Sequence, residues 1–483
     1  MERNLLALFF ALSFLISNAQ YTAIPDSNFE QALINLGIDS EGGPVDGQVL
    51  TADISSVEIL GVANQSISNL TGIQDFTALR RLVCNNNNIA TLDLSSNMNL
   101  EALFCHFNSM TSLTLPPTNT LYDLQCYQNS LTSLDVSNNT GLQVLWCYNN
   151  NIQNTLDASN CTILENFDCG FNQILSINMP NDSNTLWRFL CDNNNLSNLD
   201  VSNNSVLTDF QCYNNPSLLS LDLTNNQLLE RVFCYNNTSM SSMLLPTTST
   251  LTDIDAFTTG LTSLDASGLN GLEYLRLNQS LSLTNLILPN TTTLQTLWMY
   301  THAVSNLDLS NNTGLVNLDI ANGNLSNIDV SMLNNLQNFY CNESDLLTSL
   351  NVQNGNNHNM PYMWANDNPL LNCIQVDNPA LAESYSNWLK DAGANFSSNC
   401  SLGIDEFNKD AVVIYPNPAS DRFNVDIKTE AFYSLTNLLG KEIIKGNFVT
   451  GSNTLDIGSL SNGLYVLHLE TSDGKVTKKL IKE

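Results

Sequence analysis

A repeat of 21 or 22 residues runs through most of the chain, and this period constrains the fold more than any other feature. The copy at residues 121–141 reads LYDLQCYQNSLTSLDVSNNTG. One such copy cannot bury its own apolar side, whereas stacked copies share a continuous core, so the period indicates a solenoid. The leucines that begin the copies are Leu79, Leu100, Leu121, Leu142, Leu164, Leu186, Leu207, Leu229, Leu251, Leu272, Leu294, Leu315 and Leu336.

Two short segments of each copy alternate between apolar and polar residues. Leu124-Gln-Cys126 predicts a short strand with its Leu and Cys side chains pointing inward. Leu134-Asp-Val136 alternates in the same way and predicts a second extended segment on the opposite wall. Asn129 lies where the chain turns after the first strand, so its amide can bond the turn and stacked copies can form a ladder.

This asparagine does not recur in every copy. It lapses between residues 251 and 345, where we expect less regular turns, and it returns at Asn368. The residues that replace it are Thr259, Ser280, His302, Gly323 and Ser344.

The repeated motif L-x-x-L-x-[LCM]-x-x-N-x-[LI] resembles the leucine-rich-repeat family over most of the chain. The resemblance implies a leucine-rich-repeat solenoid of the α/β class over residues 61–365. Its turns would be 21–22 residues long, mostly strand and coil. Helical caps are expected at both ends, because the open ends of such a core need cover.

Residues 20–60 form the expected N-terminal cap and residues 366–400 the C-terminal cap. In the first, Ser27-Asn-Phe-Glu30 is a capping box, followed by an apolar helix face of Phe29, Ala32, Leu33 and Leu36. In the second, Asp377-Asn-Pro379 opens a helix with Trp388 and Leu389 on its apolar side.

Residues 1–19 are typical of a secretory signal peptide. Arg3 precedes an apolar run over residues 5–16, and Ser17-Asn-Ala19 forms a small-residue cleavage site. The run is too short to span a bilayer, and we expect no transmembrane segment elsewhere.

The composition changes at residues 401–410, which indicate a polar linker, because lysine becomes common and the repeat ends. Residues 411–483 predict about seven short strands and a small all-β sandwich. Three pieces closely resemble the C-terminal sorting domain of the type IX secretion system of Bacteroidetes. They are YPNPASDRF at 415–423, LSNGLYVLHL at 460–469 and KVTKKLIK at 475–482.

That resemblance implies a bacterial secreted protein and one partner, the type IX secretion machinery. It also implies export through the inner and outer membranes and removal of the tail. The mature protein would then be secreted or attached to the outer surface. The alternative is an ordinary β-sandwich binding module, since a fold alone does not set a function.

The net charge of −30 argues against nucleic acid and anionic lipid as partners. Much of the acid recurs in the second extended segment. Either these carboxylates only keep a long surface soluble, or they bind cations, although the sequence has no D-x-D-x-D-G calcium loop. The column consists of Asp93, Asp135, Asp157, Asp200, Asp222, Asp265, Asp308 and Asp329.

Cysteines also form a column, which invites a disulfide interpretation. Stacked strands hold equivalent Cβ atoms about 4.8 Å apart and parallel, so we expect buried apolar thiols instead. No C-x-x-C pair supports zinc, and no metal site is predicted. Cys373 and Cys400 lie off the column and form the predicted disulfide, whereas Cys161 falls in a turn without a partner. The column consists of Cys84, Cys105, Cys126, Cys147, Cys169, Cys191, Cys212, Cys234 and Cys341.

Aromatic residues flank the inward cysteines and point outward from the same wall. Exposed aromatic side chains at this density usually mark a binding surface, which solenoids present as an extended platform. The alternative is that the rings only stack across turns and stiffen the sheet. The predicted ligand-binding residues are Phe104, His106, Tyr127, Trp146, Tyr148, Tyr213, Phe233, Tyr235, Trp298 and Tyr300.

The sequence carries no recognisable catalytic motif, so we expect no catalytic residue, no cofactor and no enzymatic activity. None of the four histidines lies in H-E-x-x-H, and neither G-x-S-x-G nor a phosphate-binding Gly loop occurs.

The favoured function is a cell-surface or secreted recognition or adhesion protein that binds a protein or glycan through the strand face. The main alternative is a secreted polymer-acting enzyme with an unrecognised carboxylate site. A surface spacer is a third possibility.

Overall fold

The computed structural model describes residues 20–181, 184–400, 412–437, 440–471 and 474–483. The predicted signal peptide and linker, 1–19 and 401–410, lie outside these residues. The chain divides into two compact units, Met1–Phe396 and Ser397–Glu483. Among the described residues, no helix combines the length and the apolar character needed to cross a membrane.

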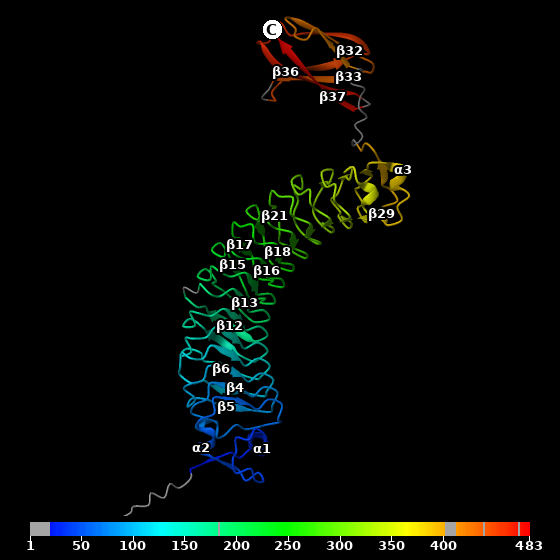
Figure 1. Cartoon of the computed structure of the whole chain (residues 1–483). Helices are drawn as coiled ribbons and strands as arrows, with labels where there is room; N and C mark the ends of the chain where they lie inside the picture. Colours follow the sequence, from blue (N-terminus) through cyan, green and yellow to red (C-terminus); the bar gives the residue numbers. More distant parts are fainter. Residues whose placement is uncertain (1–19, 182–183, 401–411, 438–439, 472–473) are drawn as a thin grey trace, which may run out of the picture. The chain divides into compact units, whose positions relative to one another are not determined.

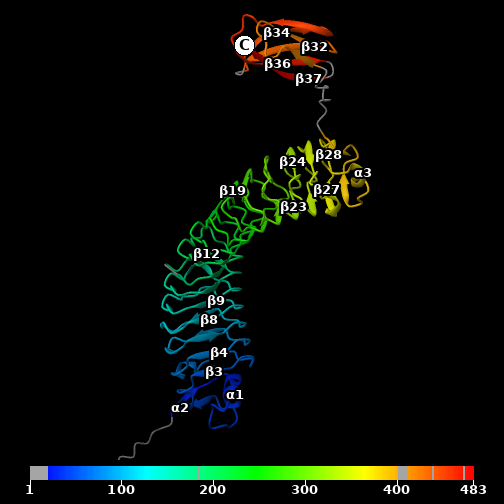
Figure 2. The ribbon, with the colours of Figure 1, turned by 45° about the horizontal axis from the view of Figure 1, so that its top comes forward.

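The first unit is a curved solenoid, as predicted, and one parallel sheet of 16 strands lines its concave side (Figures 1 and 2). In spatial order the strands are β3 (Ile59–Gly61), β4 (Arg81–Val83), β6 (Ala102–Phe104), β8 (Asp123–Gln125), β9 (Val144–Trp146), β11 (Asn166–Asp168), β13 (Arg188–Leu190), β14 (Asp209–Gln211), β16 (Arg231–Phe233), β18 (Asp253–Asp255), β20 (Tyr274–Arg276), β22 (Thr296–Trp298), β23 (Asn317–Asp319), β25 (Asn338–Tyr340), β27 (Tyr362–Ala365) and β29 (Trp388–Lys390).

Almost every strand of this sheet is three residues long and buries its middle side chain. In β8, Leu124 is fully buried and pairs in register with Leu103 and Leu145. Asp123 and Gln125 on either side of it are half-buried and face outward. Because successive side chains of a strand point to opposite faces, each three-residue strand contributes one core residue and two surface residues.

The residue after each strand points back into the core, and the chain then turns sharply. Cys126 is fully buried, and Gln128 adopts a left-handed backbone with φ 55°. An equivalent left-handed residue, uncommon for residues other than glycine, follows every strand of this sheet except β29. These residues are Asn64, Asn86, Phe107, Gln128, Asn149, Phe171, Asn193, Asn214, Asn236, Thr258, Gln279, Thr301, Asn322, Glu343 and Asp367.

The predicted asparagine ladder is present. Asn129 Nδ2 donates to the carbonyls of Cys105 (3.1 Å) and Cys126 (3.0 Å), and Oδ1 accepts from the N–H of Met110 (3.0 Å). Each asparagine therefore bonds two adjacent turns. Where the ladder lapses, the left-handed residue still recurs, as at Thr301, so the expectation of less regular turns is wrong for the backbone.

Shorter sheets form the outer wall, which confirms the second extended segment. Their strands are β5 (Thr91–Asp93), β7 (Ser112–Thr114), β10 (Gln153–Asp157), β12 (Gln173–Asn178), β15 (Ser220–Asp222), β17 (Ser242–Leu244), β19 (Ser263–Asp265), β21 (Asn285–Ile287), β24 (Asn327–Asp329), β26 (Ser349–Asn351), β28 (Cys373–Gln375) and β30 (Asn395–Ser397).

A helix covers the N-terminal end of the core, as predicted, but its N-cap residue differs from the predicted one. Helix α1 (Ser27–Asn35) buries Phe29 but leaves Leu36 half exposed. Its N-cap is Asp26 rather than Ser27, because Asp26 Oδ1 accepts from the N–H groups of Asn28 and Phe29. The cap also contains β1 (Tyr21–Ala23), β2 (Gln48–Leu50), α2 (Thr51–Ile54) and the 3₁₀ helix η1 (Ile73–Asp75).

At the other end the predicted helix is a single turn. Helix α3 (Pro379–Ala382) starts with Pro379 after the N-cap Asn378, as expected. Trp388 and Leu389 do not belong to that helix; they lie in β29, which extends the concave sheet. Trp388 closes the core, since it is buried and its Nε1 donates to the carbonyl of Met360 (2.8 Å). A 3₁₀ helix, η2 (Asn357–Asn359), precedes this segment.

The second unit is a small all-β sandwich, as predicted. Sheets of order β31-β32-β35 and β34-β33-β36-β37 share one core that includes Phe423, Leu435 and Leu467. The strands are β31 (Val412–Tyr415), β32 (Arg422–Ile427), β33 (Ala431–Asn437), β34 (Glu442–Phe448), β35 (Gly451–Asp456), β36 (Gly463–Thr471) and β37 (Gly474–Lys482).

Candidate binding surface on the concave sheet

Three positions in each turn face outward from the concave sheet. They are the first and third residues of the strand and the residue after the buried cysteine position. In the turn built on β9 these are Val144, Trp146 and Tyr148. Because the strands are parallel and in register, each position forms a column along the solenoid.

The column that follows the cysteines holds two stacks of aromatic rings. His106, Tyr127 and Tyr148 form the N-terminal ring stack, with centroids 4.4 Å apart in both pairs and planes within 9° of parallel. Two turns without rings follow. Tyr213, Tyr235 and Phe257 then form the C-terminal ring stack, with centroid spacings of 4.3 and 4.5 Å.

The ring spacing has a simple origin. Neighbouring strands lie about 4.8 Å apart, which is close to the stacking distance of planar rings. One aromatic residue in each turn therefore stacks on the next without distorting the backbone. Nine of the ten predicted residues are half-buried, and Trp298, at 38% exposed, is the open one.

The other predicted aromatic residues lie in the neighbouring column. Phe104 lies under the guanidinium of Arg81, 4.7 Å from its carbon. Trp146 Nε1 donates to Asn166 Oδ1 at 3.2 Å.

Further along, Trp298 lies 5.6 Å from the guanidinium of Arg276. Tyr300 belongs to the column of the ring stacks, and its hydroxyl donates to Glu343 at 3.3 Å. Phe233 is half-buried beside the C-terminal ring stack.

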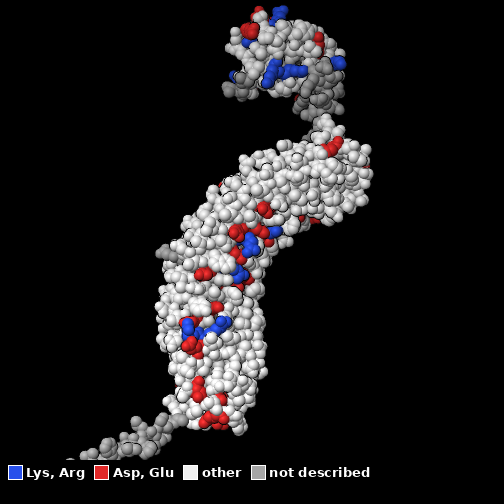
Figure 3. Space-filling view, viewed as in Figure 1, with Lys and Arg blue, Asp and Glu red and all other residues white. Residues whose placement is uncertain are grey.

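Sequence reasoning missed the column of first strand residues, which carries charge. Asp209 pairs with Arg188 at 3.4 Å and with Arg231 at 3.2 Å. Arg276, in the next column, pairs with Asp253 at 2.9 Å and Asp255 at 3.7 Å. Figure 3 shows Lys and Arg side chains gathered beside Asp and Glu side chains along the solenoid. The sequence could have revealed this column. In a strand, both neighbours of a buried leucine face outward, so the residue before it is exposed as well as the residue after it.

Burial raises the pKa of four carboxyls on this surface, those of Asp123, Asp168, Asp255 and Asp319. The pKa of Asp168 rises to about 6, chiefly through burial and also through the nearby charge of Asp192. The pKa of Asp255 also rises to about 6 through burial, although Arg276 opposes the shift.

The comparisons with known proteins agree with both units. Residues 413–483 match the family of secretion system C-terminal sorting domains. The functional domain of InlJ from Listeria monocytogenes, described as including a cysteine ladder, has a TM-score of 0.51 and 22% identity. That match covers 96% of this chain and 99% of that one. The first unit thus has the fold of leucine-rich-repeat solenoids, and the chain carries a secretion system C-terminal sorting domain, which implies export.

Two further solved structures are similar at lower TM-scores. A leucine-rich-repeat protein of Leptospira interrogans has a TM-score of 0.40 at 17% identity, and the match covers 60% of this chain and 79% of that one. The plant peptide hormone receptor RGFR1, in complex with RGF2, has a TM-score of 0.44 at 16% identity, with 68% and 64% covered. No curated protein sequence matches the chain significantly.

The cysteine column of the solenoid consists of free, buried thiols, as predicted. All nine cysteines of the column are free and buried, and burial raises the pKa of Cys84 and Cys126 to about 12. Cys161, the tenth free cysteine, has no disulfide partner, as predicted, and it is fully buried. It replaces an inward asparagine such as Asn139. Cys373 and Cys400 form the predicted disulfide.

The aspartates of the outer wall accept hydrogen bonds from the backbone of the turns that follow them. Asp135 Oδ1 accepts from the N–H of Ser137 at 2.9 Å, and the bonds to Ser137 lower the pKa of Asp135. Within the described residues, no group of three His, Cys, Asp or Glu side chains could hold a metal ion. The equivalent bond recurs at Asp93, Asp157, Asp200, Asp222, Asp265, Asp308 and Asp329.

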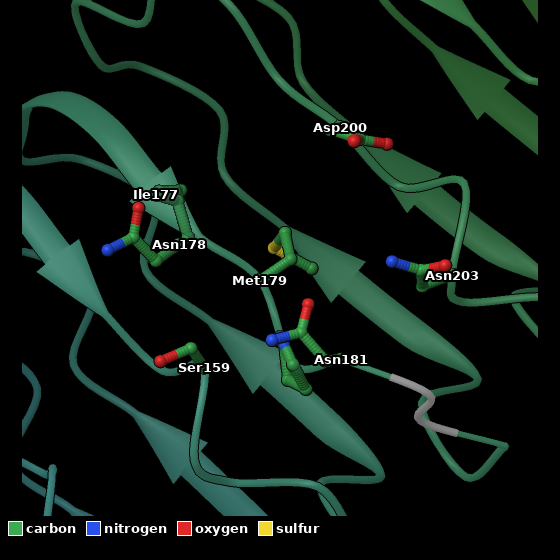
Figure 4. Close-up of a pocket in the computed structure, with 8 residues that line it drawn as sticks. Ser159, Ile177, Asn178, Met179, Asn181, Asp200 and Asn203 are labelled. Atoms are coloured by element: carbon green, nitrogen blue, oxygen red, sulfur yellow. The ribbon is translucent and has the colours of Figure 1, made fainter.

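Proline interrupts that column and opens shallow grooves on the outer wall. Pro180 occupies the place of Ser137 and has no N–H for an aspartate to cap, and Asn178 replaces the aspartate there. The groove beside it measures about 330 Å³, and Asp200 and Asn203 line its far side (Figure 4). Its lining is mostly amide, hydroxyl and carboxylate, in contrast to the aromatic concave face.

Proposed function

We propose that this protein is a recognition protein of the bacterial surface or surroundings that binds a protein partner through its concave sheet. The observation that carries the proposal is the pair of ring stacks on that face. The sorting domain provides the export that such a role requires.

Stacked rings suit recognition because their conformation is already restricted. Aromatic side chains offer a large contact area, and rings held by their neighbours lose little further entropy on binding. Beyond the stacks, Trp298 (38% exposed), Tyr362 (43%) and Trp364 (41%) keep open apolar surface on the same sheet. Stacking alone would stiffen the sheet without requiring these exposed rings.

A protein partner is favoured over a glycan by the charge pattern. Carboxylates and arginines recur between the rings, and paired charges of both signs are common in protein interfaces. The enzymatic alternative rests on Asp168 and its raised pKa near Asp192, a feature that general acids share.

The test is a binding screen of the purified chain against protein and glycan arrays. The test variant replaces Trp146, Tyr148, Trp298 and Tyr300 by alanine. A matched control replaces four exposed apolar residues outside the concave columns, Leu244, Leu281, Ile287 and Met332, by alanine. We expect the parent and the control to bind the same protein, and the test variant to bind at least tenfold more weakly.

Other results would point elsewhere. Equal binding by both variants would place the site on another face. Binding of glycans alone would show that the partner is a glycan and not a protein. Turnover of a polymer by the parent, lost in Asp168→Asn, would support the enzyme instead.

A further inference from the structure

Four two-stranded sheets of the outer wall each end two residues before a proline. They are β5-β7, β10-β12, β15-β17 and β19-β21, and the second strand of each pairs with no strand of the turn that follows. The prolines are Pro116, Pro180, Pro246 and Pro289. Grooves of about 330, 360 and 480 Å³ lie beside the last three. These three prolines are three and two turns apart, which is roughly 10–15 Å on the same wall.

The three grooves share one arrangement of side chains. Beside Pro180, the half-buried Met179 provides apolar surface, and Asn181 and Asp200 provide polar groups. In the view of Figure 4, Asp200 and Asn203 lie on one side of Met179. The equivalents of Met179, Asn181 and Asp200 are Leu245, Thr247 and Asp265 beside Pro246, and Leu288, Asn290 and Asp308 beside Pro289.

Two of the grooves are also lined by asparagine amides that have lost their usual partner. In turns that follow a regular turn, Asn160 and Asn225 donate to a backbone carbonyl of that preceding turn, at 3.0 and 3.4 Å. Asn203 and Asn311 occupy the same repeat position but follow proline turns. Both are exposed and line the grooves, and their side chains have no hydrogen-bond partner among the described residues. These amides are therefore available to a ligand.

The linings disfavour an anionic ligand and a protein ligand. No described Lys or Arg lines the three grooves, and each groove contains an aspartate, so an anionic polymer would be repelled. No aromatic residue of the described chain lines them either, whereas protein interfaces rely on Trp, Tyr and Arg anchors. What remains is a neutral ligand rich in hydrogen-bonding groups.

We propose that these grooves bind an uncharged linear polysaccharide. An amide both donates and accepts hydrogen bonds, as a sugar hydroxyl does, and a carboxylate accepts from hydroxyls. Met179 and Leu288 offer apolar surface to the C–H faces of sugar rings. A polymer that reaches several grooves gains affinity, because each later contact is intramolecular. This inference goes beyond the proposed function and concerns the opposite wall of the solenoid.

The test is affinity electrophoresis of the full chain in native gels that contain a polysaccharide. Four gels contain the uncharged polymers pullulan, laminarin, galactomannan and xyloglucan, and a fifth contains the anionic polymer alginate. We expect at least one uncharged polymer to retard the chain and alginate to leave its mobility unchanged. The groove variant, which combines Asn203→Ala and Asn311→Ala, should bind that polymer at least fivefold more weakly.

A matched control combines Asn160→Ala and Asn225→Ala. These changes remove the same side chain at the same repeat position, outside the grooves, and should alter the affinity less than twofold. All four asparagines are exposed, so we expect both variants to fold. Circular dichroism and thermal unfolding check this.

Several results would overturn the inference. They are no retardation by any of the four uncharged polymers, equal weakening in the groove variant and the control, and stronger retardation by alginate. Capture of a protein, in place of a polysaccharide, that the groove variant no longer binds would also overturn it.

Its failure is distinguishable from that of the proposed function. The four-site aromatic variant should still bind the polysaccharide, and the groove variant should still bind the protein captured by the parent. Polysaccharide binding that is lost in the aromatic variant and kept in the groove variant would place the glycan on the concave sheet and overturn the inference.

Discussion

The imidazole of His302 lies directly against Gly323 in the next turn, where any β-carbon would overlap the ring. His302 is 4% exposed, and its Nδ1 accepts from the N–H of Val304 at 3.1 Å. A large side chain in one turn is thus accommodated by the absence of one in the next. This pair replaces two successive asparagines of the inner ladder.

Gly323→Ala should destabilise the solenoid. The added methyl group must displace the buried ring, and overpacking of this kind costs about 1–3 kcal/mol. Urea denaturation at pH 7 measures the loss. Gly61→Ala is the control, because a Cβ there meets nothing within 4 Å, and its effect should stay within about 0.5 kcal/mol. Equal stability of the two variants would contradict the packing described.

His302 should also make stability depend on pH. Burial lowers the pKa of His302 to about 4, whereas in the unfolded chain it is about 6.5. The unfolded state therefore binds the extra proton first. Stability is complete above about pH 6.5 and falls as the pH drops toward 4, by on the order of 3 kcal/mol.

The variant His302→Asn restores the ladder residue and removes this titration. Urea midpoints at pH 7.0 and 4.5 should therefore fall further for the parent than for the variant. Parallel losses in both proteins would assign the acid sensitivity to other groups.

Asn150→Ala should cost about 2–4 kcal/mol of unfolding free energy. Asn150 Nδ2 donates to the carbonyls of Cys126 (3.1 Å) and Cys147 (3.0 Å), and Oδ1 accepts from the N–H of Leu131 (3.0 Å). Its removal leaves these buried backbone groups unsatisfied. Asn151→Ala, at an exposed neighbour, serves as the control and should be nearly neutral.

Much of the fold could be predicted because it is local and repeated. The inward Leu124 and Cys126, the bonds of Asn129 and the Cys373–Cys400 disulfide follow from alternation, turn chemistry and position off the column. The N-cap was mispredicted because Glu30 has a different partner. Its carboxylate accepts from the N–H groups of Asp46 and Gly47, far away in the sequence.

For the candidate surface, the sequence predicted which residues share a column but not how their side chains contact one another. The alternation places Tyr127 and Tyr148 on one face, but it does not show whether their rings stack or splay. Nor does it show that the Asp192 carboxylate leans over Gly170, since side-chain direction depends on neighbours one turn away. The charged column that contains Arg188 was missed because only residues flanking the cysteines were considered.

The cysteine column should resist thiol reagents in the native protein. Only a thiolate reacts readily, and burial raises the pKa of Cys234 to about 12 and that of Cys161 to about 11. Ellman's reagent at pH 8 should release no colour from the native chain and ten equivalents in denaturant, the disulfide being silent. Rapid labelling of the native protein would show that the turns open.

The most direct test of the account is hydroxyl-radical footprinting of the chain, alone and with the protein captured in the array screen. The account predicts that the partner protects Tyr148, Tyr213, Tyr235 and Trp298 on the concave sheet. Exposed outer residues such as Leu244 and Met332 should stay as reactive as in the free chain. Protection of the outer residues, with the concave aromatic residues unchanged, would contradict the assignment of the binding surface.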